Sequence, residues 1–288
     1  MSLFVFSCKK TSTQSSGNAD EPYIKQTVQY KLLPNTAANL LSLDIYHYSN
    51  SSLLKPVVIY VHGGGWRIGD KANNPENKIA LFQSLHYIFV SINYRLSPNP
   101  SQLSNASRIK YPDHNNDVAD AVKWVIDSIG NYGGDPAKIA LIGHSAGAHL
   151  VSLTGSSQLF LPARNIPLAA IKGIATVDTE GYDVTSQSSE ELYQNAFGTD
   201  PAIQVQASPI FNLANVYTYP NFFVAKRGTT TRIALADTFI NRLQSVGVNV
   251  QQVNGSQYDH EGINNAIGDP NDTVITPALK VFLANCFQ

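Results

Sequence analysis

The sequence predicts an α/β fold in which helices cover both faces of a mostly parallel central sheet. After residue 20, short runs of β-branched and aromatic residues alternate with segments of helical periodicity along the whole chain. Such alternation favours parallel strands joined by helical crossovers. The chain has 288 residues, of which 43% are hydrophobic, and this is enough for one large domain with a substantial core. We therefore expect residues 21–288 to form a single domain.

Seven segments have the composition of buried strands. They lie at 41–48, 56–62, 87–94, 138–143, 171–178, 221–226 and 248–253. The clearest helical pattern lies at 113–129, where apolar residues recur every three or four positions and Asp113 can act as the N-cap. Two further helices are expected at about 233–246 and at about 277–287, where Pro277 suits the first turn. Active sites in such sheets lie beyond the carboxyl ends of the strands.

Charge and cysteine content exclude several classes of function. Charged residues make up 14% of the chain and the formal net charge is −1. The chain therefore has no basic field for nucleic acid and no polybasic patch for an anionic membrane surface. Its two cysteines, Cys8 and Cys286, cannot form a metal cluster or a disulfide framework. We expect Cys286 to be a small buried hydrophobic residue.

The first 20 residues resemble the end of a bacterial lipoprotein signal. An apolar run at 3–6 and Ser7 precede Cys8, the residue that would carry the lipid, although the run is shorter than a normal signal core. The polar residues 11–20 have nothing to pack and predict a disordered tether. We expect an exported, periplasmic or outer-membrane lipoprotein that meets the membrane only through Cys8. The alternative is an accidental apolar N-terminus on a cytoplasmic protein.

Ser145 lies at the centre of a G-x-S-x-G pattern between a predicted strand and a helix-compatible segment at 148–153. This position is typical of a nucleophile elbow, a turn so tight that the serine hydroxyl is exposed above the sheet. Side chains at Gly143 or Gly147 would collide with the crossing strand and helix. The alternative interpretation is a glycine-rich turn that contains an uninvolved serine.

Three consecutive glycines, Gly63 to Gly65, follow the strand at 56–62 and precede Trp66. Such a run indicates a place where backbone N–H groups must approach another group closely. It suits an oxyanion hole, which needs fixed donors where negative charge develops in the transition state. Phosphate binding is the alternative, but the run matches neither a P-loop nor a G-x-G-x-x-G pattern.

A serine nucleophile needs a base. In enzymes with an elbow serine the acid and the histidine follow the serine in the chain. Only His149 and His260 lie downstream of Ser145. His149 is one turn along the elbow helix and should point away from the serine, whereas His260 lies in a loop after the strand at 248–253. We therefore expect His260 to be the base, against the alternative of a surface-loop histidine.

These motifs in this order resemble the α/β-hydrolase superfamily. Within it, the chain is most similar to the esterase and lipase branch with an HGGGW loop, which includes carboxylesterases and kynurenine formamidase-like enzymes. Residues 94–98 (YRLSP) and 132–136 (YGGDP) are also similar to that branch. The resemblance spans roughly residues 24–288 and implies the α/β-hydrolase fold.

The resemblance also implies site residues. It implies Ser145 as the nucleophile and His260 as the base. The backbone donors of the oxyanion hole would be Gly64, Gly65 and Ala146. His62 and Trp66 would support and line the site.

The acid does not stand where that branch usually has it, because Thr231 occupies the position after the strand at 221–226. A threonine cannot carry the charge that stabilises an imidazolium. The best substitute is Asp178, which ends the preceding predicted strand, as in lipases whose acid follows the sixth strand. Asp183 is the second candidate, and a loop-capping role for Asp178 stays open. Asp237 lies within a predicted helix, and Asp259 adjoins His260 too closely in the sequence to bond easily to its ring.

The features together predict a serine hydrolase that cleaves a small carboxylic ester through an acyl-enzyme, without a metal or organic cofactor. The connection at 179–220 is long and rich in aromatic residues, and we expect it to form a small cap or one wall of the pocket. Two alternatives are an aryl formamidase and, because of Thr231, a non-catalytic binding protein on the same fold. The sequence indicates neither the particular ester nor the oligomeric state.

Overall fold

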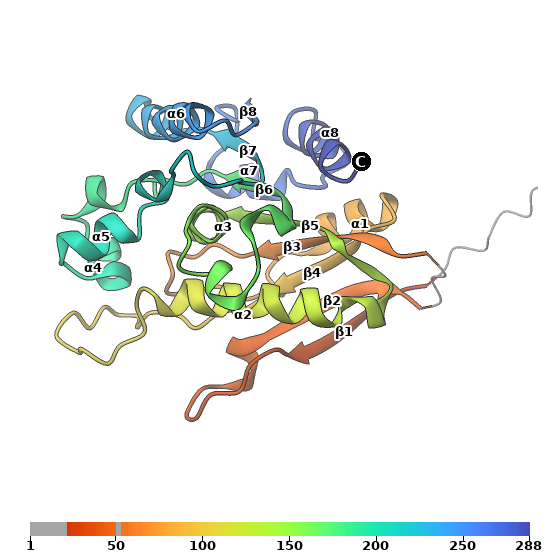
Figure 1. Ribbon diagram of the computed structural model, residues 1–288, viewed down its shortest axis with the longest axis horizontal. Helices are drawn as coiled ribbons and strands as arrows, with labels where there is room; N and C mark the ends of the chain where they lie inside the picture. Colours follow the sequence, from red (N-terminus) through yellow and green to blue (C-terminus); the bar gives the residue numbers. More distant parts are fainter. Residues whose placement is uncertain (1–21, 50–52) are drawn as a thin grey trace, which may run out of the picture.

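The computed structural model describes residues 22–49 and 53–288 (Figure 1). The predicted tether and Cys8 lie outside the described residues, so the lipid anchor stays a prediction. Among the described helices, none is both long and apolar enough to span a lipid bilayer.

Eight strands form one sheet in the order β1-β2-β4-β3-β5-β6-β7-β8. The pairs β1/β2 and β2/β4 are antiparallel, and all other neighbouring pairs are parallel. The strands are β1 Tyr23–Gln29, β2 Ser42–Tyr48, β3 Lys55–Val61, β4 Ile88–Ile92, β5 Gly134–His144, β6 Ile171–Val177, β7 Asn221–Lys226 and β8 Val250–Asn254. The predicted, mostly parallel α/β sheet is confirmed, and β1 is an additional edge strand.

Helices connect the strands and cover the sheet (Figure 1). The α-helices are α1 Glu76–Ser84, α2 Asp113–Ser128, α3 Ala146–Ser156, α4 Glu191–Phe197, α5 Pro201–Gln206, α6 Thr230–Ser245, α7 His260–Asn265 and α8 Ile275–Cys286. Short 3-10 helices are η1 Ala38–Leu41, η2 Ile129–Tyr132, η3 Pro162–Arg164, η4 Leu168–Ala170, η5 Val184–Gln187 and η6 Pro209–Asn212.

Two helix beginnings differ from the sequence prediction. Asp113 is the first residue of α2 and not its N-cap, which is Pro112. The Asp113 carboxylate instead pairs with Arg95, at 3.0 Å from Nη2. Helix α6 begins three residues before position 233, because the Thr229 side chain accepts a hydrogen bond from the backbone N–H of Arg232. Thr231 therefore lies in the first turn of α6.

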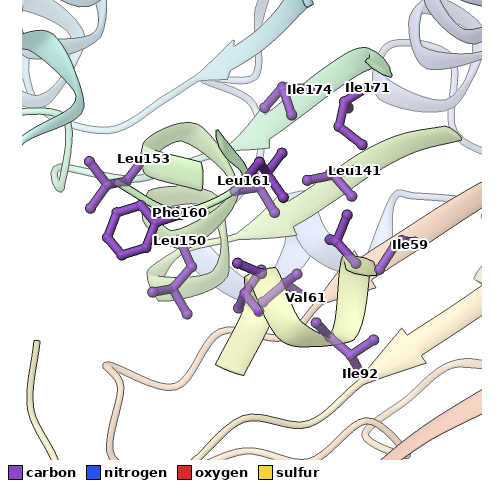
Figure 2. Close-up of a cluster of buried hydrophobic side chains, with 14 of the residues drawn as sticks. Ile59, Val61, Ile92, Leu141, Leu150, Leu153, Phe160, Leu161, Ile171 and Ile174 are labelled. Carbon is purple, nitrogen blue, oxygen red and sulfur yellow. The ribbon is translucent and has the colours of Figure 1, made fainter. Parts of the chain in front are cut away.

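Alternate residues of the central strands pack on opposite faces of the sheet. In β3, Ile59 and Val61 belong to the core under α2, α3 and α6, whereas Val58 and Tyr60 belong to the core under α1, α7 and α8. Figure 2 shows the first core, where Leu150 and Leu153 of α3 lie among residues of β3, β5 and β6. Cys286 is free and buried in the second core, as expected.

The connection between β6 and β7 contains η5, α4, α5 and η6, and α4 and α5 lie together at one end of the molecule (Figure 1). Half of its six aromatic residues serve packing, since Tyr182, Tyr193 and Phe197 are buried. Phe211 and Tyr217, in contrast, are exposed. This connection is the small cap expected from the sequence, and its helix α4 packs on Trp66 at the end of the glycine loop.

We predict that Phe223→Ala lowers the free energy of unfolding by about 3–5 kcal/mol, because a buried aromatic side chain leaves a cavity. Phe223 is fully buried in β7, and its ring centroid lies 5.6 Å from that of Phe282 in α8. Urea denaturation followed by fluorescence measures the loss. Val281→Ala is the control, since Val281 is 56% exposed on α8. An equal small effect of both substitutions would contradict this packing.

Candidate active site

Ser145 lies between the end of β5 and the start of α3, with φ 54° and ψ −119°. A non-glycine residue in this region is strained and persists only where its surroundings impose it. The backbones cross closely here: a Cβ at Gly147 would lie 2.0 Å from the carbonyl oxygen of Val61, and one at Gly143 would lie 2.2 Å from that of Gly147. Larger residues would therefore force the turn open, as expected for a nucleophile elbow.

Three side chains that are far apart in the sequence form a continuous hydrogen-bonded series, which we call the triad. The Ser145 Oγ lies 3.0 Å from His260 Nε2. On the other side of the ring, His260 Nδ1 lies 2.6 Å from Asp178 Oδ2. Since the carboxylate accepts, Nδ1 carries the proton and Nε2 is free to accept from the serine hydroxyl. The His260 side chain is 42% exposed and that of Asp178 only 2%, so the imidazole faces solvent and the carboxylate does not.

The sheet explains how these residues meet. Strands β5, β6, β7 and β8 are neighbours and run parallel, so their carboxyl ends lie at one edge. Ser145 follows β5, Asp178 follows β6, and His260 begins α7 after β8. Asp178 turns out of the sheet with φ 50°, and its backbone N–H donates to the carbonyl of Ala225 at 3.0 Å. An aspartate tolerates this left-handed conformation better than most residues.

Asp178 also binds two arginines from the loop after β7. Arg227 Nη1 donates to Oδ2 at 2.5 Å and Arg232 Nη2 donates to Oδ1 at 2.6 Å. Burial by itself would raise the pKa of Asp178, but the hydrogen bonds from His260, Arg232 and Arg227 lower it to about 2. The carboxylate is therefore charged throughout the neutral range.

The other acids that the sequence offered have different partners. Asp183 accepts hydrogen bonds from the backbone at the start of η5, including Thr185 N at 2.9 Å. Asp237 pairs with Lys226, and Asp259 accepts from Gly262 N at 2.6 Å. Thr231 is exposed in the first turn of α6. Among these positions, only Asp178 is hydrogen-bonded to His260.

The glycine loop lies against the elbow. A Cβ at Gly63 would lie 3.1 Å from the Cβ of Ser145, so the loop borders the serine directly. Within the described parts of the chain, the backbone N–H groups of Gly64 and Gly65 take part in no hydrogen bond. Ala146 is the first residue of α3 and follows Ser145 directly. The three predicted oxyanion donors thus lie in the two segments that flank the serine.

Trp66 fixes the end of this loop. Its side chain is buried, and its indole N–H donates to His149 Nδ1 at 3.3 Å. His149 Nε2 in turn donates to the carbonyl of Ala207, at 2.9 Å, in the connection between β6 and β7. The Trp66 ring also contacts Tyr193 and Phe197 of α4. The His149 imidazole therefore joins the glycine loop to the cap, whereas only the backbone N–H of His149 bonds to Ser145, at its carbonyl.

His144 is a site residue that the sequence did not single out, although it is the first variable position of G-x-S-x-G. Its Nε2 donates to the backbone carbonyl of His260 at 2.8 Å, and the two ring centroids lie 4.6 Å apart. Burial lowers the pKa of His144 to about 3, so the ring is neutral. The His144 ring therefore packs against the His260 ring and holds its backbone through this hydrogen bond. Arg227 and Arg232 were likewise visible in the sequence only as neighbours of Thr231.

The ligand atoms of His144, Asp178 and His260 lie within 4.8 Å of one another, a spacing that a metal ion could use. The hydrogen-bond partners argue for a different role. Both oxygens of Asp178 already bind guanidinium groups, whose positive charge opposes a cation at this point. We therefore interpret the cluster as a hydrogen-bonded series.

A cavity of about 290 Å³ opens beside the glycine loop. Its lining is mainly polar and comes from β3, the loop after it, β5 and α7. The lining residues include Tyr60, His62, Gly63, Gly64, His144, Glu261 and Asn264. His62 is buried and stacks on Tyr94, with ring centroids 4.5 Å apart. The predicted supporting role of His62 agrees with this position.

Known proteins of similar sequence carry esterase names. A family model described as BD-FAE matches residues 43–166, which include the glycine loop and Ser145. The chain is 37% identical over 137 residues to Esterase LipQ of Mycobacterium tuberculosis, covering 47% of this chain and 30% of that protein. It is 36% identical over 95 residues to Carboxylesterase NlhH of the same organism, covering 33% of this chain and 27% of that protein. The chain thus spans less than a third of the length of these curated relatives.

Solved structures are similar over nearly the whole chain. A hyperthermophilic esterase from the archaeon Pyrobaculum calidifontis has a TM-score of 0.69 at 20% identity, over 93% of this chain and 88% of that chain. Esterase B from Lactobacillus rhamnosis has a TM-score of 0.68 at 17% identity, over 92% of this chain and 87% of that chain. At these identities the likeness shows the fold alone. The chain thus has the fold of these esterases, and its sequence similarities, which include the glycine loop and the elbow, are to proteins named as esterases.

Four buried histidines predict a loss of stability in mild acid. Burial lowers the pKa of His62, His114, His144 and His149, to about 3 for His114 and His144 and to about 4 for His149. Below pH 6.5 the unfolded chain binds protons that these rings cannot bind in the folded state. Acid therefore favours unfolding, by about 1.4 kcal/mol per pH unit for each histidine down to its folded pKa.

Urea denaturation at several pH values between 7 and 4.5 measures this slope. We expect His149→Gln to reduce the slope, and His86→Gln, at an exposed position, to leave it unchanged. A free energy of unfolding that is independent of pH over this range would contradict the neutral state of the buried rings.

Proposed function

We propose that this chain is a serine hydrolase that cleaves small carboxylic esters. The observation that carries the proposal is the continuous hydrogen-bonded series Ser145–His260–Asp178 at the carboxyl edge of the sheet. A proton acceptor within 3.0 Å of the serine hydroxyl, with a buried carboxylate behind it, is what nucleophilic catalysis by serine requires.

In the proposed reaction, Ser145 Oγ attacks the ester carbonyl and its proton passes to His260 Nε2. The negative charge that develops on the carbonyl oxygen is stabilised by the backbone N–H groups of Gly64, Gly65 and Ala146. The imidazolium then donates its proton to the departing alkoxide, which leaves as the alcohol and completes the acyl-enzyme. A water molecule, deprotonated by His260, then attacks the acyl group. As the bond between the acyl carbon and Ser145 Oγ breaks, the imidazolium returns its proton to Oγ and the acid is released.

Asp178 is the proposed acid of this triad. It fixes the tautomer of His260 through Nδ1 and stabilises the imidazolium that forms when the serine is deprotonated. The proposed acid thus follows β6, whereas the usual place for the acid, after β7, is occupied by Thr231. A binding protein without catalysis, the alternative motivated by Thr231, has no need of a buried carboxylate aligned on the base.

The proposal predicts that Ser145→Ala abolishes turnover of p-nitrophenyl acetate, with kcat/KM at least about a thousand-fold lower. Asp178→Asn should lower kcat by about four orders of magnitude, because the imidazole loses its oriented tautomer. Asp183→Asn is the matched control and should keep near-wild-type kcat, since Asp183 caps η5. Covalent labelling of Ser145 by a fluorophosphonate at neutral pH gives an independent readout.

Two results would overturn the proposal. Absence of both ester turnover and phosphonate labelling in the folded wild-type chain would favour the binding protein. Loss of activity in Asp183→Asn, with near-wild-type kcat in Asp178→Asn, would move the acid to Asp183.

A further inference from the structure

We propose that Arg227 and Arg232 are positioning residues of the triad, which hold the Asp178 carboxylate and offset its charge so that His260 stays an unprotonated base in mildly acidic solution. The inference rests on the proposed function and deepens it. Its basis is the cluster formed by Asp178, Glu180, Arg227 and Arg232, which we call the charge cluster.

The two guanidinium groups take separate oxygens of one carboxylate. Arg227 shares Oδ2 with His260, and its Nη1 lies 3.5 Å from His260 Nδ1. Arg232 holds Oδ1 through Nη2, and its Nη1 bonds Glu180. Asp178 therefore cannot rotate away from the imidazole without losing an ion pair.

Both arginines are tied to the loops that carry the triad. Arg227 Nε donates to the carbonyl of Tyr258 at 3.1 Å, two residues before His260. Arg232 lies in the first turn of α6 and reaches Glu180, two residues after Asp178. The side chains of Arg227 and Arg232 are only 17% and 19% exposed. The charge cluster thus joins the loops after β6, β7 and β8 at the edge where the triad lies.

The charges around His260 nearly cancel. Asp178 and Glu180 contribute two negative charges from the loop after β6, and Arg227 and Arg232 contribute two positive charges from the loop after β7 and from α6. From β5, His144 faces the ring as a neutral group. Asp259 and Glu261 adjoin His260 in the chain. The buried Lys78 donates from Nζ to the carbonyl of Asn264, in the same helix as His260.

A lone carboxylate beside an imidazole favours its protonated form. The Arg227 guanidinium opposes that effect from a greater distance, with Nη1 at 3.5 Å from His260 Nδ1 against 2.6 Å for Asp178 Oδ2, and Arg232 adds a second positive charge at Oδ1. Protonation of His260 in the resting enzyme is therefore less favourable than in a triad whose acid has no cationic partners. The proton transferred from Ser145 is still stabilised by the direct bond to Asp178.

The test is the pH profile of kcat/KM for p-nitrophenyl acetate between pH 4.5 and 8. In Arg227→Gln we expect the acid limb to move to higher pH by about one unit, since a positive charge next to the ring is lost. KM should stay within about two-fold, because neither arginine is placed against the substrate.

Two control variants accompany this measurement. Arg227→Lys should restore most of the wild-type limb. Arg242→Gln, on α6 and bonded only to the Leu213 carbonyl and Ser245 among the described residues, should leave the profile unchanged.

A second variant, which removes a negative charge and is expected to shift the acid limb in the opposite direction, keeps the test valid if the first variant misfolds. Glu180→Gln removes a negative charge from the same cluster at a side chain that is 29% exposed, and the acid limb should move to lower pH. A folded Arg227→Gln enzyme whose activity falls equally at every pH, with no movement in Glu180→Gln, would make the arginines merely structural and overturn the inference.

The inference can fail separately from the proposed function. If the wild-type chain neither cleaves the ester nor reacts with a fluorophosphonate, the proposed function fails. The ring protons of His260, followed by NMR during a pH titration of the same variants, then test the charge cluster alone. Shifts of opposite sign in Arg227→Gln and Glu180→Gln support it, and identical titrations contradict it.

Discussion

The hydrogen bond between His260 Nδ1 and Asp178 Oδ2, 2.6 Å long, is the interaction on which the arrangement of the site depends. It joins residues that are 82 positions apart in the chain and that follow different strands, β6 and β8. Parallel pairing of β5, β6, β7 and β8 brings their carboxyl ends to one edge, and this bond then sets the orientation of the base toward Ser145. Without it, the exposed imidazole would have no partner to hold its tautomer.

The same edge is stabilised from two further directions. On one side the charge cluster links the three loops after β6, β7 and β8, so the position of the acid is shared among several ion pairs. On the other side Trp66 and His149 tie the glycine loop to the cap, through a buried indole and a neutral imidazole. The bonds of Trp66 and His149 are buried and those of the charge cluster are partly buried, which makes their partners costly to remove. Ser145, His260 and the proposed oxyanion donors are thereby held by contacts from several elements.

Much of this frame was predictable because it is encoded locally. The run at β7 is short, apolar and bounded by polar residues, and its observed limits are those expected. The elbow was predictable because Gly143 and Gly147 meet a steric requirement of the crossing backbones. In contrast, β1 is an exposed edge strand whose residues carry little hydrophobic signal. The start of α6 depends on a cap at Thr229, which periodicity does not reveal.

The parts of the site that could not be predicted depend on tertiary contacts. Asp178 could be ranked first among the acids from its place at a strand end, but its partners could not be assigned. Arg227 and Arg232 lie beside Thr231 in the sequence, and nothing local indicates that they reach across to β6. Likewise, the hydrogen bond from the His144 imidazole to the backbone carbonyl of His260 spans 116 positions.

Proton NMR of the His260 Nδ1–H tests the central claim, that Asp178 is the carboxylate bonded to the base, most directly. A short bond to a buried carboxylate should give a strongly downfield resonance in water, which His260→Ala removes and thereby assigns. The account predicts that this resonance disappears or moves far upfield in Asp178→Asn and persists in Asp183→Asn. Its persistence in folded Asp178→Asn, or its loss in Asp183→Asn, would contradict the account.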